Sequence, residues 1–282
     1  MPNLLSSLAI VALLASCSPT DPPTDRAIRS GRIISGTPSS VALNQSQLSS
    51  SQKEKIGRKI WQNESAGTIN GLTAWNDGEA FPSLGIGHFI WYPQGQRGPF
   101  TESFPRFIAF ANLQGKRPPG WTINRPCPWP DRASFMRDFN GPELTGLRKW
   151  LAANISIQTD FIIAKSRASL PKMLAIAGSS SDRVQTNYNN LSTTPNGQYA
   201  LIDYVNFKGE GINPAERYRG QGWGLLQVLQ EMRPTGPGQA AAAEFAAASS
   251  RVLSRRVANS GGKDQRWLAG WRNRCKTYAQ PL

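Results

Sequence analysis

Apolar residues recur at helical spacing through most of the chain beyond residue 50, and this periodicity constrains the fold more than any other sequence feature. Between Ser50 and Glu64, one apolar face is marked by Ile56, Ile60 and Trp61. Further helical segments are expected over residues 104–113, 144–155, 159–177 (interrupted at Pro171), 198–209, 222–232 and 239–259. Breaker-rich loops lie between them, at 116–121, 125–132 and 192–197. The pattern predicts a mainly α domain over residues 51–282.

One stretch departs from helical spacing. Residues 72–87, "LTAWNDGEAFPSLGIG", predict two short strands around an Asn-Asp-Gly turn. Gly85 and Gly87 leave the second strand without side chains at alternate positions, which would let another backbone or a sugar approach closely. The expected fold class is therefore α+β, mainly α, with a small β-hairpin beside a helical lobe.

The N-terminal segment predicts export. Residues 1–16 carry no charged side chain, and their apolar run is too short for a confident membrane span, so it reads as a signal peptide. "LLASC" resembles the bacterial lipoprotein signal, which would make Cys17 the lipidated N-terminus, although the usual Lys or Arg is missing. Residues 17–50 have the composition of a flexible tether. We expect a lipid-anchored protein of the bacterial cell envelope that faces the periplasm; an ordinary cleaved signal with an incidental cysteine is the alternative.

Charge and composition narrow the partners. The 32 basic and 18 acidic residues give a net charge of +14, which favours an anionic partner such as nucleic acid, an acidic membrane face or an anionic polymer. No nucleic-acid-binding motif is present, and export argues against such a partner. Without Cys17, the remaining cysteines, Cys127 and Cys275, are free to pair. The single histidine, His88, has no Cys/His metal spacing around it, so neither a metal nor another cofactor is expected.

Glu64 is the first candidate for catalysis. It follows Ile60 by four residues and so lies on the apolar face, where burial should raise its pKa. A carboxyl group of raised pKa at a helix end suits a general acid for glycoside cleavage, unless the helix ends a turn earlier and Glu64 is solvated. Such cleavage normally needs a second group. Asp77 in the turn and Glu79 at the start of the second strand are available, and strand alternation places Glu79 on the same face as Ser83.

The segment "SLGIGHF", residues 83–89, resembles the T-[IV]-G-[YI]-G-H strand of phage-type lysozymes. Ser83 takes the Thr place, and the next matching positions run from Gly85 to His88. The resemblance covers residues 56–90 and implies a lysozyme-like fold, with Glu64 as general acid and a second carboxylate on the hairpin. It also implies that Ser83 holds water or the second acid and that His88 ties the hairpin to the helical lobe.

The choice of second acid stays open between two residues. The distance from Glu64 to Ser83 is four residues longer than in the resembling family, and Ser65 replaces the Gly that usually follows the catalytic Glu. Position relative to Ser83 favours Asp77, whereas strand alternation favours Glu79. We favour Glu79.

A second, looser resemblance links residues 209–229, "GEGINPAERYRGQGWGLLQVL", to the lytic transglycosylase pattern. It makes Glu210 an alternative catalytic residue. Otherwise this region is expected to form a wall of the same cleft, with polar groups from Tyr204, Asn206, Glu210 and Gln227. Trp223 would then be either a sugar-stacking platform or a core residue.

These features together predict a peptidoglycan-degrading glycoside hydrolase of the muramidase type. The expected partners are peptidoglycan or a related glycan, and a membrane through the lipid anchor. The alternatives are a lytic transglycosylase that uses Glu64 or Glu210, and an envelope lipoprotein that binds glycan without cleaving it.

Overall fold

The computed structural model describes residues 47–98 and 100–282. The predicted signal peptide, Cys17 and nearly all of the predicted tether lie outside the described residues. Within the described part of the chain, no helix has the length and apolar character needed to span a membrane.

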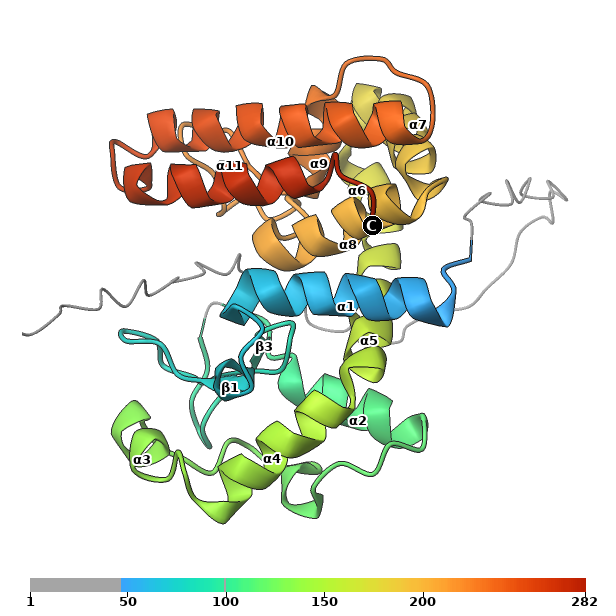
Figure 1. Cartoon of the computed structure of the whole chain (residues 1–282). Helices are drawn as coiled ribbons and strands as arrows, with labels where there is room; N and C mark the ends of the chain where they lie inside the picture. The colour runs from blue at the N-terminus through green and yellow to red at the C-terminus, as the bar shows by residue number, and fades with distance from the viewer. Residues whose placement is uncertain (1–46, 99) are drawn as a thin grey trace, which may run out of the picture.

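Helix α1 (Ser50–Ser65) crosses the middle of the molecule (Figure 1). It begins with a capping box, in which Ser49 and Gln52 exchange side-chain and backbone hydrogen bonds. Its buried residues include Ile56, Ile60 and Glu64, so the predicted apolar face is confirmed, and the helix extends far enough to bury Glu64.

The sheet has three antiparallel strands in the order β1 (Thr73–Ala74), β2 (Ser83–Leu84) and β3 (Phe89–Ile90). The predicted hairpin is present as the pair β1–β2, with Ala74 opposite Ser83. The strands are shorter than expected, because residues 75–82 form a loop in which the Glu79 N–H donates to the Asn76 carbonyl.

The prediction that β2 continues through the glycines is wrong. The strand ends at Leu84, and a turn closed by the His88 N–H and the Gly85 carbonyl leads into the unpredicted strand β3. Gly85 has φ +71° and His88 φ +47°, which are turn conformations rather than strand conformations. A Cβ on Gly85 would lie 2.3 Å from Gln158 Oε1. The close approach that glycine permits is therefore made by a side chain of the protein itself, not by a sugar.

The helices fall into two groups on either side of α1 (Figure 1). The group with the sheet contains α2 (Phe104–Leu113), α3 (Arg132–Arg137), α4 (Pro142–Ala153) and the 3₁₀ helices η1 (Asn70–Leu72) and η2 (Gly120–Thr122). The other contains α6 (Ser169–Ile176), α7 (Ser181–Ser192), α8 (Pro195–Lys208), α9 (Leu225–Glu231), α10 (Gln239–Asn259), α11 (Leu268–Thr277), η3 (Gly178–Ser180) and η4 (Gln265–Trp267). Helix α5 (Ile155–Arg167) packs against α1 and joins the two groups.

Most predicted helices are confirmed, and α2 and α10 match their expected bounds. The segment expected to break at Pro171 instead breaks at Ala168, because proline in the first turn of α6 loses no helical hydrogen bond. Helices α3, α7 and α11 lie outside the predicted segments. The sequence of α7 is mostly polar, and Val184, Tyr188 and Leu191 supply its buried stripe.

One large hydrophobic cluster runs through both groups of helices, from Leu48 to Tyr278. On the sheet side it is strongly aromatic: the Trp91 ring contacts the rings of Phe104, Trp121 and Trp129. The core therefore fixes the sheet against α1, which positions His88 close to the end of that helix.

Gly57 sets the spacing between α1 and α5. A Cβ at Gly57 would lie 2.2 Å from Thr159 Oγ1 and 2.9 Å from Ile155 Cγ2. We expect Gly57→Ala to destabilise the protein by about 1–3 kcal/mol through overpacking, despite the better helix propensity of alanine. Gly146→Ala in α4, where a Cβ meets nothing within 4 Å, should stabilise it by about 0.5–1 kcal/mol. Denaturant unfolding measures both, and an equal effect of the two substitutions would contradict this account.

Candidate active site

Glu64 lies in the last turn of α1, at a point where three other segments meet. Its side chain is only 2% exposed. Its Oε1 atom accepts hydrogen bonds from Arg274 Nη2 on α11 at 2.6 Å and from Asn206 Nδ2 on α8 at 3.2 Å. Its Oε2 atom faces Nδ1 of His88, in the turn between β2 and β3, at 3.5 Å. One carboxylate oxygen is thus fixed by two donors, while the other faces the sheet.

Arg274 is itself held by a second buried carboxylate. Its Nε and Nη2 atoms donate to the two oxygens of Asp203 on α8, both at 2.8 Å. Tyr278 donates its hydroxyl to Asp203 Oδ2 at 2.7 Å. Bidentate pairing of this kind fixes the guanidinium plane, so Glu64 is oriented by a rigid donor.

The environment lowers the pKa of Glu64, so the prediction that it is raised is wrong. Burial alone would raise the pKa of this carboxyl group. The charge of Arg274, the nearby His88 and the hydrogen bonds from Arg274 and Asn206 outweigh burial and lower it. Glu64 is therefore ionised at neutral pH in the free protein.

His88 is buried against this carboxylate. Burial lowers the pKa of His88, Glu64 opposes that effect and Arg274 adds to it. Within the described chain, its buried Nδ1 atom has no hydrogen-bond partner. The imidazole is therefore neutral near pH 7 and packs the sheet turn against the helix end.

The two hairpin acids differ in environment. Asp77 is exposed in the turn, whereas Glu79 is partly buried and accepts a hydrogen bond from Asn76 Nδ2 at 3.2 Å. Burial raises the pKa of Glu79, and the Asn76 hydrogen bond partly offsets the effect. The argument that Glu79 shares a strand face with Ser83 does not hold, because Glu79 lies in a loop. Ser83 is fully buried, with no partner for its Oγ atom among the described residues.

The sequence predicted that polar groups come from Tyr204, Asn206, Glu210 and Gln227. Of these four, Asn206 bonds to Glu64. Tyr204 is fully buried and its hydroxyl donates to the Trp223 carbonyl, so it serves packing. Gln227 bonds to the backbone of Gly211 and Gly224, which fastens the two ends of a loop.

Trp223 and Glu210 are also largely buried. The Trp223 ring is 7% exposed and contacts Tyr218 and Arg256, which is the core role left open by the sequence. Glu210 Oε1 pairs with Lys172 Nζ at 2.9 Å, and its buried Oε2 atom has no partner among the described residues. Neither side chain contacts Glu64 in the described structure.

Sequence reasoning missed Arg274 and Asp203, the two residues that orient Glu64. Asp203 had a recognisable signal, since it is the single charged residue in a mostly apolar helical stretch, "ALIDYVNF". Arg274 had none, because it is one of several basic residues near the C-terminus.

Cys127 and Cys275 do not pair: both are free and buried. Burial raises the pKa of each thiol to about 12, so both are unreactive thiols of the core. In the part of the chain that the structure describes, no cluster of His, Cys, Asp or Glu could hold a metal ion.

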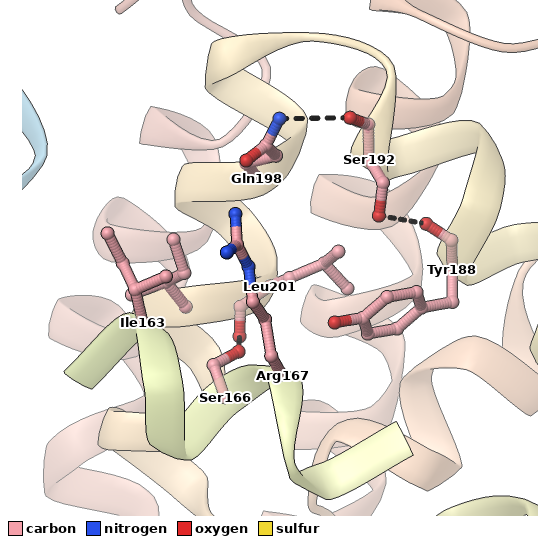
Figure 2. A pocket seen from close by; sticks show the side chains of 8 residues that line it. Ile163, Ser166, Arg167, Tyr188, Ser192, Gln198 and Leu201 are labelled. Atoms are coloured by element: carbon pink, nitrogen blue, oxygen red, sulfur yellow. Dashed lines mark hydrogen bonds between the residues drawn. The ribbon is translucent and has the colours of Figure 1, made fainter. Parts of the chain in front are cut away.

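Two cavities lie away from Glu64. The one in Figure 2 measures about 10 Å³, enough for a single water, and is bordered by Arg167, Tyr188 and Gln198 from α5, α7 and α8. The other measures about 250 Å³ and lies between α7 and the segment after α9, lined by Asp182, Arg183, Thr186, Asn187, Met232, Pro234 and Thr235. The candidate site is therefore defined by its buried carboxylate rather than by either cavity.

No protein-family model matches the chain, and neither a curated protein nor a solved structure matches it. The geometry around Glu64 is therefore the basis for the function proposed below.

Because the folded pKa of Glu64 lies below its unfolded value of about 4.3, ionised Glu64 stabilises the fold above that value, and the contribution is lost as pH falls through the folded pKa. We expect Glu64→Gln to lower the free energy of unfolding by about 1–3 kcal/mol at pH 7. The difference in this free energy between the variant and the wild type should narrow toward pH 3. Glu54→Gln, which alters an exposed pair with Arg58, should show no such narrowing. Denaturant unfolding across this pH range tests it; parallel curves for wild type and Glu64→Gln would contradict it.

Proposed function

We propose that this protein is a lysozyme-like glycoside hydrolase of the bacterial cell envelope. It cleaves peptidoglycan or a related β-linked amino-sugar polymer, with Glu64 as its catalytic residue. The observation that carries the proposal is the buried Glu64 carboxylate, held at the junction of a helix end, a sheet turn and two further helices. Burying an ion network of this kind is costly, and a hydrophobic cluster of similar volume would often be at least as stable. Such a network is a functional-site candidate on physical grounds.

Further support comes from the combination of sequence and architecture. The phage-lysozyme-like segment 83–89 forms the β2–β3 turn, and its His88 lies 3.5 Å from Glu64 Oε2. Because Oε1 is fixed by Arg274 and Asn206, Oε2 is the oxygen available to exchange a proton with a glycosidic oxygen. Glu64 would act as the general acid, after taking up a proton that the free protein does not hold at neutral pH.

The second group remains Glu79 or Asp77. Carboxyl groups about 5–5.5 Å apart retain configuration, and those about 6.5–9.5 Å apart invert it. The described contacts link neither hairpin acid to Glu64. This favours a lytic transglycosylase as the second candidate function, because that reaction requires no second carboxylate. The same chemistry at Glu210, or glycan binding without cleavage, would also fit a protein of this architecture.

Replacement of Glu64 tests the assignment. We expect Glu64→Gln to reduce turnover of purified peptidoglycan by about 10²–10⁴-fold, because the proton donor is lost. Glu231→Gln is the matched control: Glu231 also has a pKa lowered by arginines, but it pairs with Arg251 and Arg255 away from the site. Product masses then separate the mechanisms, since reducing ends indicate hydrolysis and anhydro ends a transglycosylase.

Full activity in Glu64→Gln would overturn the assignment and make Glu210→Gln the next variant to measure. No turnover by the wild type, with glycan still retained, would leave the binding protein as the better description.

The pH dependence of turnover distinguishes an acid from a base. If Glu64 must be protonated, kcat/KM should rise by up to about tenfold per pH unit as pH falls from 8 toward the lowered pKa of Glu64. A decline at still lower pH would report the second carboxylate. A rate that rises with pH only close to the lowered pKa of Glu64 and is constant above it would assign Glu64 the role of base. The measurement is steady-state turnover of a soluble glycan fragment between pH 4 and 8.

A further inference from the structure

Three buried cations alternate with aromatic rings behind Glu64, in what we call the cation–aromatic ladder: Arg274, Phe207, Lys208, Trp271, Arg256 and Trp223. The Phe207 ring centroid lies 4.1 Å from the Arg274 guanidinium and 4.0 Å from Lys208 Nζ. Lys208 Nζ also lies 3.6 Å from the Trp271 ring centroid. The ladder draws on α8, α10, α11 and the loop before α9, which carries Trp223, and it starts at the residue that pairs with Glu64.

The cations of the ladder differ in their counter-ions. Arg274 pairs with Glu64 and Asp203, and Arg256 pairs with Asp264 at 2.7 Å. Lys208 is only 1% exposed, yet among the described residues no carboxylate lies within ion-pair distance of its ammonium. The aromatic faces are its nearest partners, and they compensate a buried charge only in part.

The charges around Lys208 come from four segments. Burial lowers the pKa of Lys208 well below its usual range, and Arg256 on α10 and Arg274 on α11 lower it further. Asp264, after α10, and Glu64 on α1 oppose this effect without cancelling it. An approaching anion would oppose this effect and favour the charged form of the amine.

Stability alone does not account for a lysine at this position. A methionine of similar length would fill the same space without a desolvation penalty. The Phe207 ring contacts both Lys208 and Arg274, the residue that pairs with Glu64, and the charge of Glu64 acts on Lys208. An anionic group on a substrate bound at Glu64 would supply the missing counter-ion, in keeping with the net charge of +14.

We propose that Lys208 recognises a carboxylate carried by the polymer that binds at Glu64, which makes it a specificity-determining residue. The inference rests on the proposed function and narrows its substrate to acidic amino-sugar polymers, as against neutral chitin-like or cationic chitosan-like ones. The carboxylate could come from a lactyl ether on the sugar or from an attached peptide, and both present the same chemistry to the ammonium.

Three small probes separate these sources in titrations of the full chain. N-acetylmuramic acid carries the lactyl carboxylate, muramyl dipeptide carries its free carboxylate on the peptide, and N-acetylglucosamine carries none. We expect at least one acidic probe to bind about tenfold more tightly than N-acetylglucosamine. Calorimetry in buffers of different ionisation enthalpy should show proton uptake with that probe, and its affinity should fall by up to about tenfold per pH unit as pH rises.

The Lys208→Met variant should bind all three probes equally weakly, while its stability to denaturant stays the same or increases. A purely structural lysine would not produce this combination. Lys53→Met is the matched control. Lys53 lies near the start of α1 and pairs with Asp160 on α5, so this variant should keep the preference for acidic probes.

Equal affinities of the wild type for all probes, no measurable binding of any probe, or a preference that survives in Lys208→Met would each overturn the inference. The same titrations in Glu64→Gln measure binding of the probes independently of any glycan cleavage. A carboxylate preference without glycan cleavage by the wild type would therefore refute the proposed hydrolase and leave carboxylate recognition by Lys208 standing.

Discussion

The guanidinium of Arg274 is the interaction on which the candidate site depends. It joins Glu64 at the end of α1 to Asp203 in α8, and Tyr278, just beyond the end of α11, closes the group. Without this cation, the buried Glu64 carboxylate would lose the counter-charge that outweighs its burial in a region of low dielectric. The guanidinium thus sets the charge state of Glu64, its orientation and the choice of Oε2 as the free oxygen.

The same cation connects the site to the packing behind it. The Phe207 ring lies against both Arg274 and Lys208, so the aromatic side chains of this half serve as both core and electrostatic environment. Several buried charges enter the core here as ion pairs, whereas Lys208 has no carboxylate partner among the described residues. The sheet contributes from the other side, where the Gly85–His88 turn brings an imidazole to the remaining oxygen of Glu64.

Local features of the sequence were sufficient for the framework of the fold and for part of the site. The spacing of Ile56, Ile60 and Glu64 predicted the buried face of α1, and the Asn-Asp-Gly turn predicted the β1–β2 pair. The sign of the pKa shift at Glu64 could not be predicted, because it depends on Arg274, 210 residues further along the chain. Hydrophobic burial produces a periodic pattern in the sequence, whereas pairing of charges far apart in the chain produces none.

That separation of 210 residues also bears on how the protein acquires its site. The ribosome delivers a chain from its N-terminus, so α1 and the sheet are available long before α11. Until α11 docks, Glu64 lacks the cation that orients it and lowers its pKa. Closing a loop of this length carries a conformational-entropy cost that the contact must offset. A chain truncated before α11 would therefore lack the cation that fixes Glu64.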